Sequence, residues 1–199
     1  MAGDSARERI LDAAVELFHR DGYNAASLRQ ISEIVGLQVG SLYNHISSKE
    51  ALLFEIMNGV LVELLDETVV EMERSGPDPV ARTTAFLRTS IRFHAQRQKE
   101  TFIGNTELRG LSEDHRREIV ALRDRYEGLL RSALEDGVAG GRLVIHDVPL
   151  ATRAAIALCT SVAVWYRAGG RMSIDELQHE LPRLFGPLAG IPVPERATA

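Results

Sequence analysis

The sequence predicts an all-α protein, and two features of the chain carry that prediction. Apolar residues recur at intervals of three and four along most of its 199 residues, which is the period of a helix with one buried face. Period-two runs of β-branched residues are absent, and no Asn-Gly or Asp-Gly pair joins two such runs as a hairpin would require. With 45% apolar and 26% charged residues, the chain can bury a core without disulfides or metals.

The first predicted helix ends at Asp21-Gly22, where Gly22 suits the position after a C-cap. Its apolar residues fall on one helical face: Ile10, Ala13, Ala14, Leu17 and Phe18. A short second helix is expected after Ser27, a suitable N-cap, and it ends at Gly36. Another short helix is expected from Val39 through residue 45.

The remaining chain is predicted as longer helices. Ser48 caps one that runs to about Arg74, before Pro77 prevents its continuation. Pro182 is expected to kink or split the last helix, and residues 189–199 are expected to fray. The later helices are predicted at about residues 80–98, 112–139, 147–167 and 173–188, with a short apolar-polar piece at about 101–111.

Residues 27–45 have the layout of a helix-turn-helix, in which the second short helix enters the major groove of DNA. The side chains of Gln38 and Asn44 can pair with base edges. Ser41 and Tyr43 can donate hydroxyls to phosphates, and Gly40 allows close approach of the backbone. The full set of candidate DNA contacts is Ser27, Arg29, Gln38, Gly40, Ser41, Tyr43, Asn44, His45 and Lys49.

The order of short motifs in this segment resembles that of a known family. Ser27-Leu28-Arg29-Gln30-Ile31-Ser32, Val35-Gly36-Leu37, Gly40-Ser41-Leu42-Tyr43-Asn44-His45-Ile46 and Ser48-Lys49-Glu50-Ala51-Leu52-Leu53 follow one another in this order. Together with the preceding helix they look like the DNA-binding domain of TetR-type transcriptional regulators, over about residues 7–55. One departure is Ile46, where the family commonly has phenylalanine; this is a packing position and not an expected DNA contact.

The resemblance implies a helix-turn-helix head at residues 1–50, a ligand-binding and dimerisation bundle at 51–190 and a tail at 191–199. It further implies a homodimeric repressor that a small effector releases from a palindromic operator. The alanine-rich helix near residues 151–163 and the last helix are the expected dimer interface. Candidate effector contacts are Phe86, Phe93, His94, Phe102, Asn105, Leu108, Arg109, Tyr126, Trp165 and Arg167. Each apolar member, taken alone, is more typical of an ordinary core position than of a ligand contact.

A second resemblance concerns Trp165-Tyr166-Arg167-Ala168-Gly169-Gly170. It is similar to a Trp-Tyr-Arg-Pro-Gly-Gly segment of TetR relatives that respond to acyl-CoA thioesters, with Ala168 in place of the proline. An indole suits an acyl chain or a base, and Arg167 suits phosphates. The alternative is a helix end with a cationic C-terminus and a glycine stop.

Charge and composition restrict the other possibilities. The net charge is −5, and residues 1–50 hold five basic against seven acidic side chains, so nonspecific affinity for DNA should be weak. No signal peptide or apolar run long enough for a membrane span is recognised, which favours the cytoplasm and no membrane partner. One cysteine and scattered histidines offer no metal set, and no cofactor or catalytic motif is found. The rival hypotheses are a repressor without a ligand and a small helical enzyme.

Overall fold

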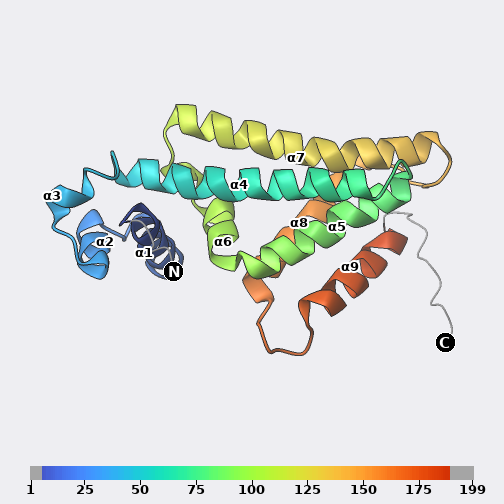
Figure 1. Ribbon diagram of the computed structural model, residues 1–199. Helices are drawn as coiled ribbons and strands as arrows, with labels where there is room; N and C mark the ends of the chain where they lie inside the picture. The colour runs from blue at the N-terminus through green and yellow to red at the C-terminus, as the bar shows by residue number, and fades with distance from the viewer. Residues whose placement is uncertain (1–5, 189–199) are drawn as a thin grey trace. The chain divides into compact units, whose positions relative to one another are not determined.

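The computed structural model describes residues 6–188, and every regular element within that range is helical (Figure 1). The expected tail at residues 189–199 lies outside the described part of the chain. The elements are α1 (Ala6–Asp21), α2 (Leu28–Val35), α3 (Val39–Leu42), α4 (Lys49–Arg74), α5 (Pro79–Gln96), α6 (Gln98–Thr106), the short 3₁₀ helix η1 (Leu108–Gly110), α7 (Glu113–Ala139), α8 (Val148–Trp165) and α9 (Ile174–Leu188).

The chain divides into two compact units. The head unit comprises the described residues up to Val62 together with Arg97–Ala121, and the body unit comprises Glu63–Gln96 and the described residues from Leu122 onward. The head unit therefore holds α6 and the first part of α7 besides the N-terminal helices. The expected division at residue 50 is a division by function, and it stays a prediction.

Capping hydrogen bonds explain why these helices begin where the sequence predicts. The Ser27 hydroxyl accepts from the Gln30 backbone N–H at 3.3 Å, and the Gln30 side chain accepts from the Ser27 N–H at 2.9 Å. Ser173 and Glu176 form the same reciprocal pair before α9. Gly36 ends α2 with φ of 71°, a left-handed conformation that glycine adopts without strain.

One prediction about helix extent is wrong. The helix expected to reach residue 45 ends at Leu42, because the next amides bond three residues back: Asn44 N–H to Ser41 and His45 N–H to Leu42. Of the two effects expected at Pro182, a split does not occur, since α9 continues to Leu188, and a kink stays a prediction. Proline removes one backbone hydrogen bond, but burial of Leu181 and Phe185 on either side favours the unbroken helix.

The core of the head unit is apolar. It includes Leu17 and Phe18 of α1, Leu42 of α3 and Leu52 and Leu53 of α4, each at most 1% exposed. Burial of a leucine or phenylalanine side chain contributes about 2 kcal/mol. This core fixes the buried side of α3 and leaves its other side to solvent.

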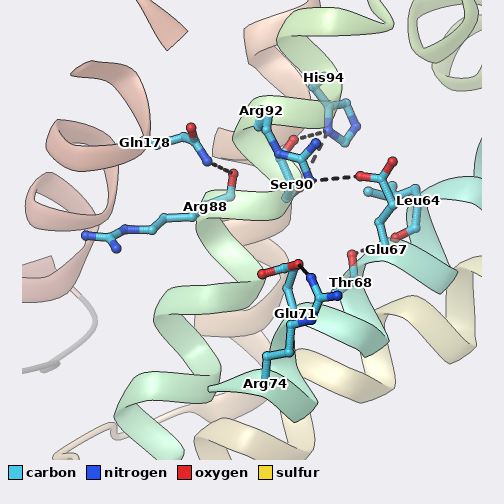
Figure 2. A network of polar contacts seen from close by, with 10 residues as sticks. All are labelled: Leu64, Glu67, Thr68, Glu71, Arg74, Arg88, Ser90, Arg92, His94 and Gln178. Carbon is cyan, nitrogen blue, oxygen red and sulfur yellow. Dashed lines mark hydrogen bonds and ion pairs between the residues drawn. The ribbon is translucent and has the colours of Figure 1, made fainter. Parts of the chain in front are cut away.

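In the body unit, α5 lies against α8 and α9, and polar side chains accompany the apolar core. Figure 2 shows the Arg92 guanidinium paired with the Glu67 carboxylate at 2.9 Å, which joins α5 to α4. The Gln178 side chain of α9 donates to the backbone carbonyl of Arg88 at 3.1 Å. These contacts connect α5 to α4 and to α9.

Candidate functional site

The α3 segment, residues 38–46, has an exposed polar face and a buried apolar side. Leu42 and Ile46 are buried at 0% and 7% exposure, and they hold the segment to the head core. The exposed residues of the segment are Gln38, Val39, Gly40, Tyr43 and Asn44, while Ser41 and His45 are half-buried. The predicted base-edge and phosphate contacts are therefore brought onto one short stretch of surface.

The two candidates from the start of α2 are exposed and have local partners. Ser27 forms the capping box described above, so its hydroxyl is already used within the helix start. The Arg29 guanidinium pairs with the Glu33 carboxylate at 3.0 Å, with 81% of the Arg29 side chain exposed. Such an exposed pair contributes little stability, so Arg29 can exchange its partner for a phosphate at low cost.

Lys49 is placed differently from the sequence expectation of a surface phosphate contact. Its ammonium donates to the backbone carbonyls of Tyr23 at 2.9 Å and Ala26 at 2.8 Å. It also lies 4.3 Å from the centre of the Tyr23 ring, within range of a cation–π interaction. Lys49 thus fastens the α1–α2 loop to the start of α4, and its contact with DNA stays a prediction.

Arg7 is a residue that the sequence reasoning missed. Its guanidinium forms two hydrogen bonds to the Glu55 carboxylate, at 3.1 and 2.7 Å, and donates a third to the carbonyl of His45 at 2.6 Å. Arg7, Glu55, Tyr43 and Asn44 help to line a surface hollow of about 320 Å³. No local pattern announces these contacts, because the partners are 38 and 48 residues apart in sequence.

A second polar connection in the head unit joins α4 to the start of α7. The Glu50 carboxylate accepts from the backbone N–H of Ser112 and contacts Nδ1 of His115, both at 2.8 Å. The His115 ring stacks on Phe54, with ring centres 3.8 Å apart. Burial alone would raise the pKa of Glu50, but the Ser112 and His115 contacts outweigh it and hold that pKa below its ordinary value.

The predicted effector contacts fall in both units. Phe102, Asn105, Leu108 and Arg109 belong to the head unit; Asn105 and Arg109 are exposed, and the Phe102 ring lies edge-on to His19 at 5.2 Å. The remaining candidates belong to the body unit: Phe86, Phe93, His94, Tyr126, Trp165 and Arg167. Within the body unit, the structure brings some of these candidates together in pairs.

Phe86 and Tyr126 pack inside the body unit, with ring centres 4.6 Å apart. Burial raises the pKa of Tyr126, whose hydroxyl lies near Thr68, Ser90 and Cys159 and makes no hydrogen bond of good geometry. Burial likewise raises the pKa of Cys159 to about 12. Both groups are therefore neutral, and the interior around them carries hydroxyl and thiol groups without net charge.

His94 is also a buried neutral group. It is 3% exposed, and burial lowers its pKa below the ordinary value. Its Nδ1 lies 2.8 Å from the backbone carbonyl of Ser90, one helical turn earlier (Figure 2). A neutral ring that donates through Nδ1 leaves Nε2 as an acceptor.

Trp165 and Arg167 do come together, at the end of α8. Trp165 is 47% exposed, and its indole N–H donates to the Ser161 hydroxyl at 3.1 Å. We call the adjoining space the α8–α9 hollow; it measures about 340 Å³ and is lined by Trp165, Tyr166, Arg167, Gly170, Arg171 and Met172. It combines an aromatic wall with two guanidinium groups.

The outer face of α8 is apolar. Leu150 and Val164 are 64% and 70% exposed, and the exposed Ala154 and Ala157 lie between them at helical spacing. By length and composition α8 is the one helix in the described range that could cross a membrane. The core helix of a soluble protein passes the same test, so a single such helix is weak evidence for a span.

Comparison with known proteins adds independent information about both regions. Residues 10–56 match the family described as bacterial regulatory proteins, tetR family. Residues 76–186 match the tetracyclin repressor-like, C-terminal domain. The second match alone spans more than half of the chain.

Three relatives illustrate the similarity. The HTH-type transcriptional repressor KstR2 of Rhodococcus jostii is 32% identical over 171 residues, which cover 85% of this chain and 83% of that protein. The structure of the TetR family regulator PfmR from Thermus thermophilus is 31% identical with a TM-score of 0.81, covering 89% and 96% of the two chains. AibR in complex with isovaleryl coenzyme A and operator DNA has a TM-score of 0.81 at 24% identity, covering 94% and 100%.

Proposed function

The chain belongs to the TetR family of bacterial regulatory proteins, and we propose that it is a homodimeric repressor that a small apolar or acyl-CoA-type effector releases from a palindromic operator. The observation that carries the DNA-binding part is the exposed polar face of the α3 segment, anchored by buried Leu42 and Ile46. A protein of this kind acts in the cytoplasm and needs no cofactor or catalytic group.

In this proposal the side chains of the α3 segment make two kinds of contact with DNA. Gln38 and Asn44 hydrogen-bond to base edges, and Gly40 allows the backbone to come close. Tyr43, Ser41 and His45 contact phosphates, with Arg29 at the start of α2, while Ser27 caps that helix. The acidic balance of residues 1–50 makes nonspecific binding weak, so affinity depends on these focused contacts and on two copies of the head.

The exposed apolar face of α8 supports dimerisation through α8 and α9. Leu150, Ala154, Ala157 and Val164 form a stripe on which a second copy of α8 can pack, and Leu184 of α9 adds a further 65% exposed side chain. Small residues in the middle of the stripe permit close approach of two helices. A two-fold dimer then presents two recognition helices to the two halves of a palindrome.

The α8–α9 hollow supports an acyl-CoA-type effector. Arg167 and Arg171 offer guanidinium groups to phosphates, and Trp165 offers an aromatic surface to an acyl chain or to adenine. The complex of AibR indicates that the same fold can hold a coenzyme A thioester, and because operator DNA is bound in that complex too, release in this proposal is a loss of DNA affinity and not mutual exclusion. Effector binding would release DNA by favouring a conformation in which the two heads no longer match the half-sites.

A thermal-unfolding screen tests the effector class. The purified protein is heated with acyl-CoA thioesters of several chain types, with the matching free acids and with coenzyme A alone. A rise in unfolding temperature with one thioester, but not with its acid or with coenzyme A, is the expected result. The same thioester should weaken binding to a duplex selected from a random-sequence library, and Trp165→Ala should reduce this response while DNA affinity is retained.

The rival hypotheses give different results in the same experiment. A repressor without an effector binds the selected duplex but shows no thermal shift with any thioester. Failure to select any duplex would contradict DNA binding itself. Turnover of a thioester during the assay, seen as release of free coenzyme A, would instead favour an enzyme.

A further inference from the structure

The α3 helix makes few interactions of its own that could fix its orientation. It spans only Val39–Leu42, and Gln38 at its N-cap makes no side-chain capping bond. Helices this short are unstable without tertiary support, because nucleation costs more than so few hydrogen bonds return. The direction in which Tyr43 and Asn44 project must therefore be set by contacts from neighbouring elements.

Buried Leu42 and Ile46 secure the inner side of this segment, but apolar contacts do not specify the direction of a turn as a hydrogen bond does. The guanidinium of Arg7 supplies such a bond, at 2.6 Å to the carbonyl of His45. His45 directly follows the two exposed residues Tyr43 and Asn44. A bond at this carbonyl fixes the end of the turn that carries them.

Glu55 holds the Arg7 guanidinium in the orientation that this bond needs. The two hydrogen bonds between them, at 3.1 and 2.7 Å, form the bidentate geometry in which arginine is most strongly oriented. One side chain of α1 is thus aligned by α4 and supports the turn after α3. The hollow beside it, lined also by Tyr43 and Asn44, leaves room for these side chains to turn if the support is lost.

We infer that Arg7 is a positioning residue for DNA recognition, acting through the carbonyl of His45 under the alignment imposed by Glu55. The inference rests on the proposed DNA-binding function. Arg7 contributes to the difference in affinity between an operator and other DNA, since the base-edge contact of Asn44 depends on the direction of the turn that carries it.

The competing account is that Arg7, which is 52% exposed, touches a DNA phosphate directly. The two accounts predict opposite effects for Glu55→Gln. If Arg7 is a phosphate contact, removal of the neighbouring negative charge strengthens binding to every duplex. If Arg7 is a positioning residue, the same change loosens the guanidinium and weakens binding to the operator.

The experiment compares Arg7→Gln and Glu55→Gln with Arg9→Gln, which removes the same charge from another exposed position of α1. The probes are a duplex selected from a random library by the wild-type protein and a scrambled duplex of the same length. Arg7→Gln and Glu55→Gln should each weaken binding to the selected duplex about tenfold and change binding to the scrambled one by less than about twofold. Arg9→Gln should affect both duplexes equally, and circular dichroism verifies that each variant is folded.

Three results would overturn the inference. Tighter binding of both duplexes by Glu55→Gln, with an equal loss on both and a smaller salt dependence for Arg7→Gln, would make Arg7 a phosphate contact. Unchanged affinity of a folded Arg7→Gln variant for the selected duplex would remove Arg7 from recognition altogether. If the wild-type protein selects no sequence, the proposed function fails, and this inference fails with it.

Discussion

The ammonium of Lys49 donates a 2.9 Å hydrogen bond to the backbone carbonyl of Tyr23 and lies 4.3 Å from the centre of the same tyrosine's ring. A second bond, to the carbonyl of Ala26, completes the attachment of the α1–α2 loop to α4. One cation thus serves two carbonyls that follow the end of α1 and that no helix satisfies. Because Lys49 makes these contacts within the head unit, its substitution should lower the stability of the protein.

Lys49→Met should lower the free energy of unfolding by about 2 kcal/mol, because two buried carbonyls lose a charged donor. Denaturant unfolding measures this change. Lys99→Met is a matched control, since Lys99 of α6 pairs with Glu16 at side chains that are 44% and 61% exposed, and this pair should contribute much less. Equal stability of Lys49→Met and the wild-type protein would contradict the role of Lys49 in fastening the loop.

Tyr43→Phe should weaken binding to the selected duplex without changing stability. Tyr43 is 55% exposed, so its hydroxyl is available to a phosphate and contributes nothing to the core. The expected loss is about threefold to tenfold, and fluorescence anisotropy with a labelled duplex measures it. Tyr23→Phe is not a suitable control because that ring is buried, whereas Tyr166→Phe lies in the body unit and should leave DNA affinity unchanged.

Gly110→Ala should destabilise the head unit. A Cβ at this position would lie 2.7 Å from carbons of the Tyr23 ring and 2.8 Å from Cδ2 of Leu53, closer than packed atoms allow. The expected loss is about 1 to 3 kcal/mol, measured by denaturant unfolding. Gly59→Ala provides the control, because its Cβ meets nothing within 4 Å on an exposed part of α4 and should stabilise the helix.

The Glu50 carboxylate should make stability depend on pH in the acidic range. Its pKa in the folded protein lies below the ordinary value, so the unfolded chain takes up a proton first as the pH falls. The stabilisation is fully present above the unfolded pKa of about 4.3 and is lost as the pH falls through the folded value. Unfolding of the wild-type protein and Glu50→Gln, followed from about pH 7 to about pH 3, should show a difference that shrinks with acidity. A difference independent of pH would contradict this assignment.

The helices and the recognition segment could be predicted from sequence because their causes are local. Apolar spacing places the buried face of α1, and the pairs Ser27–Gln30 and Ser173–Glu176 are separated by three residues. Such signals need no knowledge of the rest of the fold. The same local reasoning left open whether Pro182 kinks or splits the last helix; α9 is not split, and burial of the neighbouring side chains favours its continuation.

Three charged contacts of the head unit were decided by the tertiary structure alone. Lys49 meets Tyr23 across 26 residues, Arg7 meets Glu55 across 48, and Glu50 meets His115 across 65. The sequence shows that these side chains carry charge, but a long flexible side chain can reach either DNA or a neighbouring helix. Which one it reaches depends on where packing of the apolar core places the helix ends, and that placement is a property of the whole fold.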